Sequence, residues 1–113
     1  MFPIQFSELN NVKVKQGDIT FDSKKEVAKW NELKMLEKSG LLTNLKRQVK
    51  FEIVPKNKDE RAAFYVADFV YETPSGKRII LDVKSKATRE NPLYILKRKL
   101  VKNIYKDYEF QEC

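Results

Sequence analysis

Two apolar segments joined by a short turn constrain the fold of this chain more than any other feature. Residues 63–71 and 78–84 are rich in β-branched and aromatic side chains, which favour strands. The segment between them, Thr73-Pro-Ser-Gly76, is typical of a turn, so the pair predicts an antiparallel hairpin. Apolar and charged residues alternate over 49–53, up to Pro55, which predicts a half-buried strand before the hairpin. The sequence therefore predicts a three-stranded antiparallel meander within residues 45–85.

Amphipathic helices are predicted on either side of this meander. Ser23-Lys-Lys-Glu26 matches the capping-box pattern and begins a helix over residues 23–39. Asn91 and Pro92 suit the cap and the first residue of a second helix, over residues 92–105. The expected buried face of the second helix consists of Leu93, Leu96, Leu100 and Ile104.

Shorter elements complete the predicted fold. Two short strands are expected around Gly17-Asp18, and a short fourth strand of the main sheet at residues 108–110. No repeat or flexible linker divides the chain, so residues 1–113 are predicted to form a single domain. Helices that must bury their apolar faces on one sheet give a mixed α/β fold in layers.

Composition excludes several kinds of chemistry. The chain has no His and one Cys, Cys113, which excludes a Ser/His/Asp triad, a Cys/His dyad, a His-ligated zinc site and an internal disulfide. Carboxylates, Lys and a hard metal ion remain as catalytic groups. The net charge of +7 favours an acidic partner such as nucleic acid. No signal peptide or long apolar run is present, so we expect a soluble intracellular protein with no membrane partner.

Two acids within the predicted hairpin are the candidate catalytic groups. We predict the register that places Asp68 directly opposite Asp82, with Lys84 on the same face as Asp82. Carboxylates this close repel each other unless a cation lies between them. Lys84 supplies one cation and Mg²⁺ (or Mn²⁺) a second, with the backbone carbonyl of Val83 as a further metal ligand. The alternative is that these charges are exposed residues that protect an edge hairpin from aggregation.

The pattern of an acid followed two residues later by Lys is not specific by itself. It occurs three times in this highly charged chain, and only the last occurrence lies in a predicted strand behind another acid-bearing strand. The context of that last occurrence therefore carries the prediction. The three segments are Asp22-Ser-Lys24, Glu32-Leu-Lys34 and Asp82-Val-Lys84.

This arrangement resembles the PD-(D/E)xK nuclease superfamily. An acid in a strand, a hairpin turn and then Asp82-Val-Lys84, with Glu26 on a preceding helix, are the residues that carry the resemblance, which spans roughly residues 18–106. The chain is more similar still to one family of small phage and prophage proteins, catalogued as a domain of unknown function. Ala67 stands where the superfamily has its Pro, and Leu81 and Ser85 stand where we expect an acid and a Gly.

The resemblance implies a restriction-endonuclease-like fold and a metal-dependent activity. Asp68 and Asp82 would be metal ligands, Lys84 the catalytic lysine, and Glu26 an additional acid that reaches the metal shell through water. It also implies a phage-encoded or prophage-encoded protein acting in the cytoplasm of a bacterial host. The implied processes are replication, recombination or packaging of phage or mobile-element DNA.

Two of these residues have simpler explanations. Glu26 is the last residue of the capping box, where its carboxylate can bond back to the amide of Ser23 and close the helix start. Gln48 opens the first strand of the meander and could hydrogen-bond a phosphate or the attacking water, or could simply be solvated.

The predicted second helix is strongly basic. Residues 89–106 contain six Lys and Arg residues and one Glu. A basic face opposite the leucine stripe suits the phosphates of duplex DNA. Such a helix could also be an ordinary solvated surface, lie on a membrane or bind an acidic protein. The residues expected to contact DNA on this face are Lys97, Arg98, Lys99 and Lys102.

The sequence therefore predicts a metal-dependent DNA endonuclease. The alternative is a non-catalytic DNA-binding or protein-binding accessory protein on the same fold. A chain of 113 residues covers little DNA, and a homodimer that places two sites on two strands is compatible with that size.

Replacing Lys97, Lys99 and Lys102 together by Gln tests the basic helix. Each lost phosphate contact should lower the slope of log affinity against log salt by about one unit without changing base preference, because fewer counterions are released. The measurement is DNA binding at about 50 and 200 mM salt. Unchanged affinity at both concentrations would identify this face as ordinary solvated surface.

Overall fold

The predicted meander forms the centre of a four-stranded sheet in the computed structural model, which describes residues 13–113. The strand order is β3-β4-β5-β6. The first three strands are antiparallel neighbours, and β6 pairs parallel to β5. The meander and the short fourth strand are thus confirmed. The strands are β3 (Thr43–Val54), β4 (Ala63–Glu72), β5 (Arg78–Asp82) and β6 (Tyr108–Glu112).

Helices and a small second sheet surround this sheet. Both long helices begin at the predicted caps, Ser23 and Asn91, whose side chains accept backbone N–H groups of the first turn. The short helix α3 (Lys86–Arg89) is not among the elements that the sequence predicts. None of the helices in the described part of the chain is long and apolar enough to cross a membrane. The remaining elements are β1 (Val14–Gln16), β2 (Ile19–Phe21), α2 (Lys24–Lys38), α3 (Lys86–Arg89) and α4 (Pro92–Ile104).

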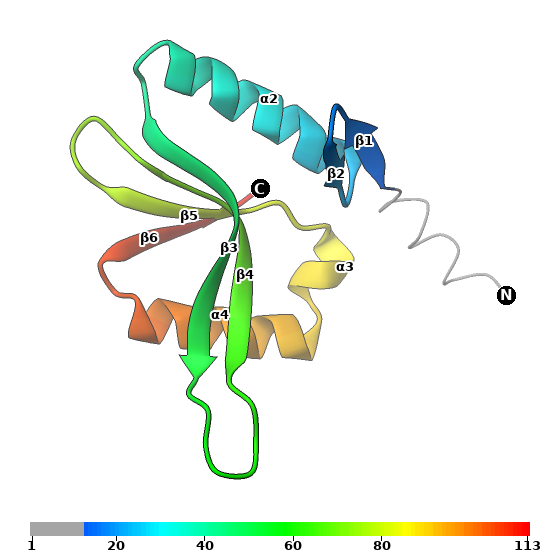
Figure 1. Ribbon diagram of the computed structural model, residues 1–113, viewed down its shortest axis with the longest axis vertical. Coiled ribbons are helices and arrows are strands. Elements are labelled where there is room, and N and C mark those ends of the chain that lie inside the picture. Colours follow the sequence, from blue (N-terminus) through cyan, green and yellow to red (C-terminus); the bar gives the residue numbers. More distant parts are fainter. Residues whose placement is uncertain (1–12) are drawn as a thin grey trace, which may run out of the picture.

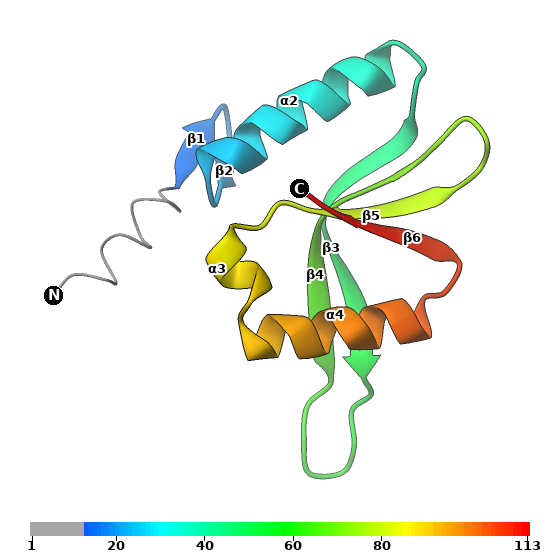
Figure 2. The same ribbon diagram turned by 180° about the vertical axis from the view of Figure 1, so that it is seen from behind.

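The long helices pack on opposite faces of the sheet, which gives a mixed α/β fold. Tyr94 and Val101 of α4 join one buried cluster, and Leu33 of α2 joins the other. Strand β5 separates the two clusters, because Ile80 contributes to the α4 cluster while Ile79 contributes to the α2 cluster. Helix α4 crosses behind β3 and β4 in Figure 1 and in front of them in Figure 2.

The predicted buried face of α4 is wrong at three of its four positions. Leu93, Leu96 and Ile104 are 61%, 55% and 46% exposed. Leu100 does pack on the core, and Tyr94 and Val101 are the buried residues of the helix. Aromatic packing sets the rotation of the helix, because a large ring buries more apolar area than a leucine side chain. The Tyr94 ring packs against Tyr65, and after the helix end the Tyr105 hydroxyl donates to the carbonyl oxygen of Glu52.

The sheet exchanges its two faces at Gln48 and Asp68. Side chains two residues apart on a regular strand point the same way. On β4, however, Ala67 belongs to the α4 cluster while Phe69 belongs to the α2 cluster. Gln48 lies across from Asp68, between the pairs Arg47↔Phe69 and Val49↔Ala67, and its φ of 53° is in the left-handed region.

The exchange also separates the neighbours of Asp68 on β4, because Val66 is exposed while Val70 packs on the α4 cluster. One prediction about this region is wrong. Gln48 does not open β3 but lies in its interior. A left-handed backbone at a residue other than Gly costs about 1–2 kcal/mol, and strand patterning assumes a regular backbone, so the sequence did not indicate this exchange.

Replacing Phe69 by Ala tests the α2 cluster. The Phe69 ring is fully buried and stacks on Trp30 at a centroid distance of 6.0 Å. Its loss should reduce the free energy of unfolding by about 3–5 kcal/mol, because removing it leaves a cavity. Urea denaturation measures this loss of stability. The control is Phe64→Ala, which should reduce the free energy of unfolding much less, because Phe64 is half-exposed. Equal losses would contradict the assignment of Phe69 to the core.

Candidate functional site

The candidate site lies where the pairing of β4 with β5 ends. The last paired residues are Phe69 and Leu81, in the predicted register. One residue further, a side chain makes the next connection: the Asp82 Oδ1 atom accepts a hydrogen bond from the backbone N–H of Asp68 at 2.9 Å. Asp68 and Asp82 are therefore brought together at the point where the strands separate.

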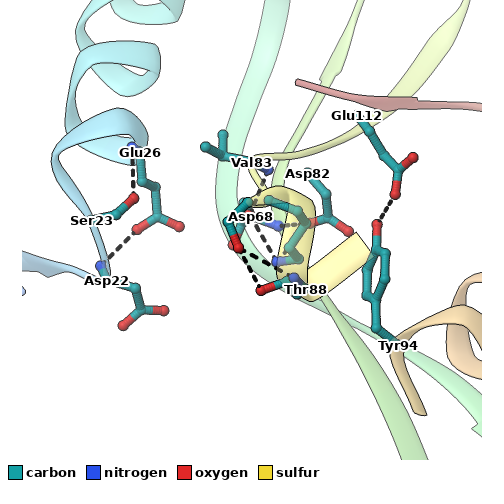
Figure 3. Close-up of polar contacts among 11 residues, drawn as sticks. Asp22, Ser23, Glu26, Asp68, Asp82, Val83, Thr88, Tyr94 and Glu112 are labelled. Atoms are coloured by element: carbon teal, nitrogen blue, oxygen red, sulfur yellow. Dashed lines mark hydrogen bonds and ion pairs between the residues drawn. The ribbon is translucent and has the colours of Figure 1, made fainter. Parts of the chain in front are cut away.

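The ammonium of Lys84 lies between the two carboxylates. Its Nζ atom is 3.2 Å from Asp68 Oδ2 and 3.7 Å from Asp82 Oδ1. The Asp68 Oδ2 atom also accepts the backbone N–H of Val83 at 2.8 Å. Figure 3 shows Asp68 of β4 close to Asp82, the last residue of β5, and to Val83. If these residues were exposed charges that protect an edge hairpin from aggregation, their side chains would not meet in this way.

Burial makes this cluster electrostatically unusual. Asp82 is 0% exposed, and burial raises the pKa of its carboxyl, an effect that the Lys84 charge only partly offsets. Burial also lowers the pKa of Lys84, but the charges of Asp82 and Asp68 outweigh that effect and raise it above its ordinary value of 10.5. Lys84 is therefore a permanent cation within the cluster at neutral pH.

Glu26 approaches the cluster from the first turn of α2. Ser23 Oγ accepts the backbone N–H of Glu26 as in a capping box, but the return bond differs from the expected one. The Glu26 carboxylate accepts the N–H of Asp22 at 3.0 Å, and not that of Ser23. Burial, and then the neighbouring Asp68 carboxyl, raise the pKa of Glu26 from 4.5 to about 7. The carboxyl is thus poised to exchange a proton near neutral pH.

A cavity of about 360 Å³ opens beside these groups. Four of the predicted site residues, Glu26, Asp68, Val83 and Lys84, line it, whereas the fully buried Asp82 does not. The sequence analysis missed other lining residues. Ser85 could have been predicted as the cap of a short helix, because Ser is a preferred N-cap residue. In the structure its Oγ accepts the backbone N–H of Thr88 at 3.2 Å. The lining residues that were missed are Lys13, Asp22, Ser23, Ser85 and Thr88.

The end of β6 supports the segment that carries Asp82 and Lys84. The N–H of Cys113 donates to the Asp82 carbonyl oxygen at 2.9 Å, and the Lys84 N–H donates to the Cys113 carbonyl oxygen at 3.1 Å. Beside it, Glu112 accepts the hydroxyl of Tyr94 and pairs with Arg98 at 3.1 Å. These contacts fix the backbone on which the cluster is built.

The other predicted DNA contacts lie outside the cavity lining. Gln48 is exposed on β3, across from Asp68. On α4, Lys99 and Lys102 are exposed and Lys97 is half-buried, whereas Arg98 is paired with Glu112. The structure therefore separates the candidate catalytic cluster from the basic helix, and DNA contact by these residues stays a prediction.

Comparison with known proteins identifies a family but no activity. The model of the family described as "Protein of unknown function (DUF1064)" matches residues 6–112. No curated protein and no solved structure matches the chain.

Glu26 should make folding stability depend on pH. Its pKa is raised in the folded state, so folding favours the protonated carboxyl, and this stabilisation is complete below about 4.5 and lost as the pH rises through about 7. We expect a loss on the order of 3 kcal/mol over this range. Urea unfolding in EDTA at several pH values measures it.

The Glu26→Gln variant should lack this component of the pH dependence, because an amide does not titrate in this range. Glu32→Gln on the same helix is the control, because Glu32 is an exposed partner of Lys29 and should leave the dependence unchanged. Identical curves for the wild type and Glu26→Gln would show that Glu26 titrates normally.

Proposed function

Because the chain belongs to the DUF1064 family, whose description gives no function, we propose a function from its own residues: a metal-dependent DNA endonuclease that hydrolyses phosphodiester bonds. The observation that carries the proposal is the meeting of Asp68, Asp82 and Lys84 beside a cavity. Two carboxylates and a lysine in one cluster are the groups needed to hold a cation and to stabilise a reacting phosphate.

The residues of the cluster suit a hard divalent cation. Among the described residues, Asp82 Oδ2 has no hydrogen-bond partner although it is buried. A buried carboxylate oxygen without a partner costs free energy, which a proton or a cation would offset. Asp68 and Asp82, with the Val83 carbonyl, would supply the oxygen ligands that Mg²⁺ or Mn²⁺ prefers. A bound ion would polarise the phosphate and acidify the attacking water.

The side chains of the chain would divide the remaining work. Lys84 orients the water and stabilises the negative charge that develops on the phosphate oxygens. Glu26 holds a proton near neutral pH at the cavity wall, where it can exchange that proton with water. The Lys13 ammonium lines the same cavity and adds positive charge where a phosphate would enter.

Nucleic acid is the substrate that the charge favours. The net charge of +7 attracts phosphates, and the exposed Lys99 and Lys102 offer a second contact surface on α4. We further propose a restriction-endonuclease-like fold, supported by the order of helix, antiparallel meander, helix and parallel strand. A phage or prophage origin, action in the bacterial cytoplasm and assembly as a homodimer remain parts of this proposal.

The second candidate is a non-catalytic DNA-binding or protein-binding accessory protein. One observation favours it: α4 presents Leu93, Leu96 and Ile104 to solvent beside its lysines, as a surface for a partner would. Such a protein should bind its target equally well in EDTA and should cleave no DNA with Mg²⁺ or Mn²⁺.

Two substitutions separate metal binding from catalysis. Asp82→Asn should abolish both Mn²⁺ binding, measured by calorimetry, and DNA cleavage, because it removes a charged ligand. Lys84→Ala should retain the metal but lose about 10²–10³-fold in cleavage rate, because the ammonium acts on the water and the transition state.

The matched control is the segment Glu32-Leu-Lys34 on α2, which has the same spacing of acid and lysine but lines no part of the cavity. Glu32→Gln and Lys34→Ala should leave metal binding and cleavage unchanged. Cleavage that survives both Asp82→Asn and Lys84→Ala would assign the activity to another site or to a contaminant.

A further inference from the structure

Within residues 13–113, no helix covers one face of the β3–β4 hairpin. Tyr65 and Ala67 point into the α4 cluster, so their neighbours on β4 point to the opposite face. Figure 1 views this face, with α4 behind the hairpin. Its apolar side chains, which we call the outer hairpin face, are Val54, Phe64 and Val66, at 43%, 39% and 40% exposure.

The surroundings of the outer hairpin face carry both charges. Lys50 lies on the same face, and its Nζ atom is 5.8 Å from the centroid of the Phe64 ring. Glu52 lies across from Phe64 on β3, and residues 50–66, which include the loop between β3 and β4, contain four Lys and Arg residues and three Asp and Glu residues. An aromatic side chain with a lysine beside its ring is a surface that suits nucleic acid, because rings stack on bases and lysines attract phosphates.

The outer hairpin face also leads to the cavity. Phe64, Val66 and Asp68 are alternate residues of β4, and Asp68 lines the cavity. Four residues of a strand span about 14 Å, which is about four base steps along one strand of DNA. A DNA strand whose phosphate lies at Asp68 could therefore place a nearby base on Phe64.

We infer that the outer hairpin face binds unpaired bases of the DNA next to the phosphate at Asp68, so that the protein selects DNA with a single-stranded segment. Bases within a duplex are stacked on one another and do not present their faces, whereas unpaired bases do. The inference deepens the proposed function and depends on it for the phosphate at Asp68.

Binding by Phe64 variants tests the inference. The probes are a fluorescent blunt duplex and the same duplex with a 5′ or a 3′ single-stranded overhang, measured by anisotropy with Ca²⁺ in place of Mg²⁺, so that a cation occupies the cluster while cleavage is suppressed. Phe64→Ser should weaken binding to at least one overhang probe about five-fold or more, and change blunt-duplex binding less than about two-fold. Phe64→Tyr should retain wild-type affinity, because it keeps the ring.

Leu41→Ser is the matched control, because it removes an exposed apolar side chain between α2 and β3 that does not line the cavity. It should leave overhang binding unchanged, and circular dichroism should give the same folded spectrum for all variants. Three results would overturn the inference: equal weakening of blunt and overhang binding by Phe64→Ser, no weakening at all, or a change in oligomeric state on sedimentation in place of a change in DNA affinity.

The same proteins separate this inference from the proposed function. If the wild type cleaves no DNA with Mg²⁺ or Mn²⁺ while Phe64→Ser still weakens overhang binding selectively, the nuclease proposal fails and the single-strand surface stands. If the wild type cleaves DNA and Phe64→Ser binds every probe as the wild type does, the surface is wrong and the nuclease proposal stands.

Discussion

The contact of Lys84 with two buried carboxylates is the interaction around which this structure is organised. Burying Asp68 and Asp82 would cost more free energy than folding can supply without nearby positive charge and N–H donors. The Lys84 ammonium supplies the charge, and the backbone N–H groups of Asp68 and Val83 supply the donors. The cluster thereby joins β4 to the segment after β5 at the point where their backbone pairing ends.

The exchange of faces at Gln48 and Asp68 explains how one small sheet serves two helices and a site. Residues 49–53 of β3 and 63–67 of β4 contribute to the α4 cluster, whereas Leu45, Phe69 and Tyr71 contribute to the α2 cluster. Asp68 lies at the boundary between these two parts of the sheet. Asp68 and its neighbour Glu26, at the start of α2, both line the cavity. The left-handed backbone of Gln48 is the local cost of this geometry, and strained backbone is commonly found at functional sites.

The surfaces near the site suggest a division of labour. The cavity contains the charged groups that we propose act on a phosphate, and the outer hairpin face presents the apolar groups that we infer bind bases. The exposed lysines of α4 lie on a separate surface. A protein of this size would thus hold its substrate with several small contacts rather than with one deep pocket.

The sequence by itself determined the elements and the main register. Alternating apolar residues, the turn at Thr73-Pro-Ser-Gly76 and the caps at Ser23 and Asn91 are local signals, and they placed the meander, both long helices and the approach of Asp68 to Asp82. Only the tertiary structure decided which face of α4 is buried, because its leucine stripe and its tyrosine face are both apolar in sequence. The same holds for the exchange of faces and for the approach of Lys13 and Thr88 to the cavity, since these depend on packing between distant segments rather than on any local pattern.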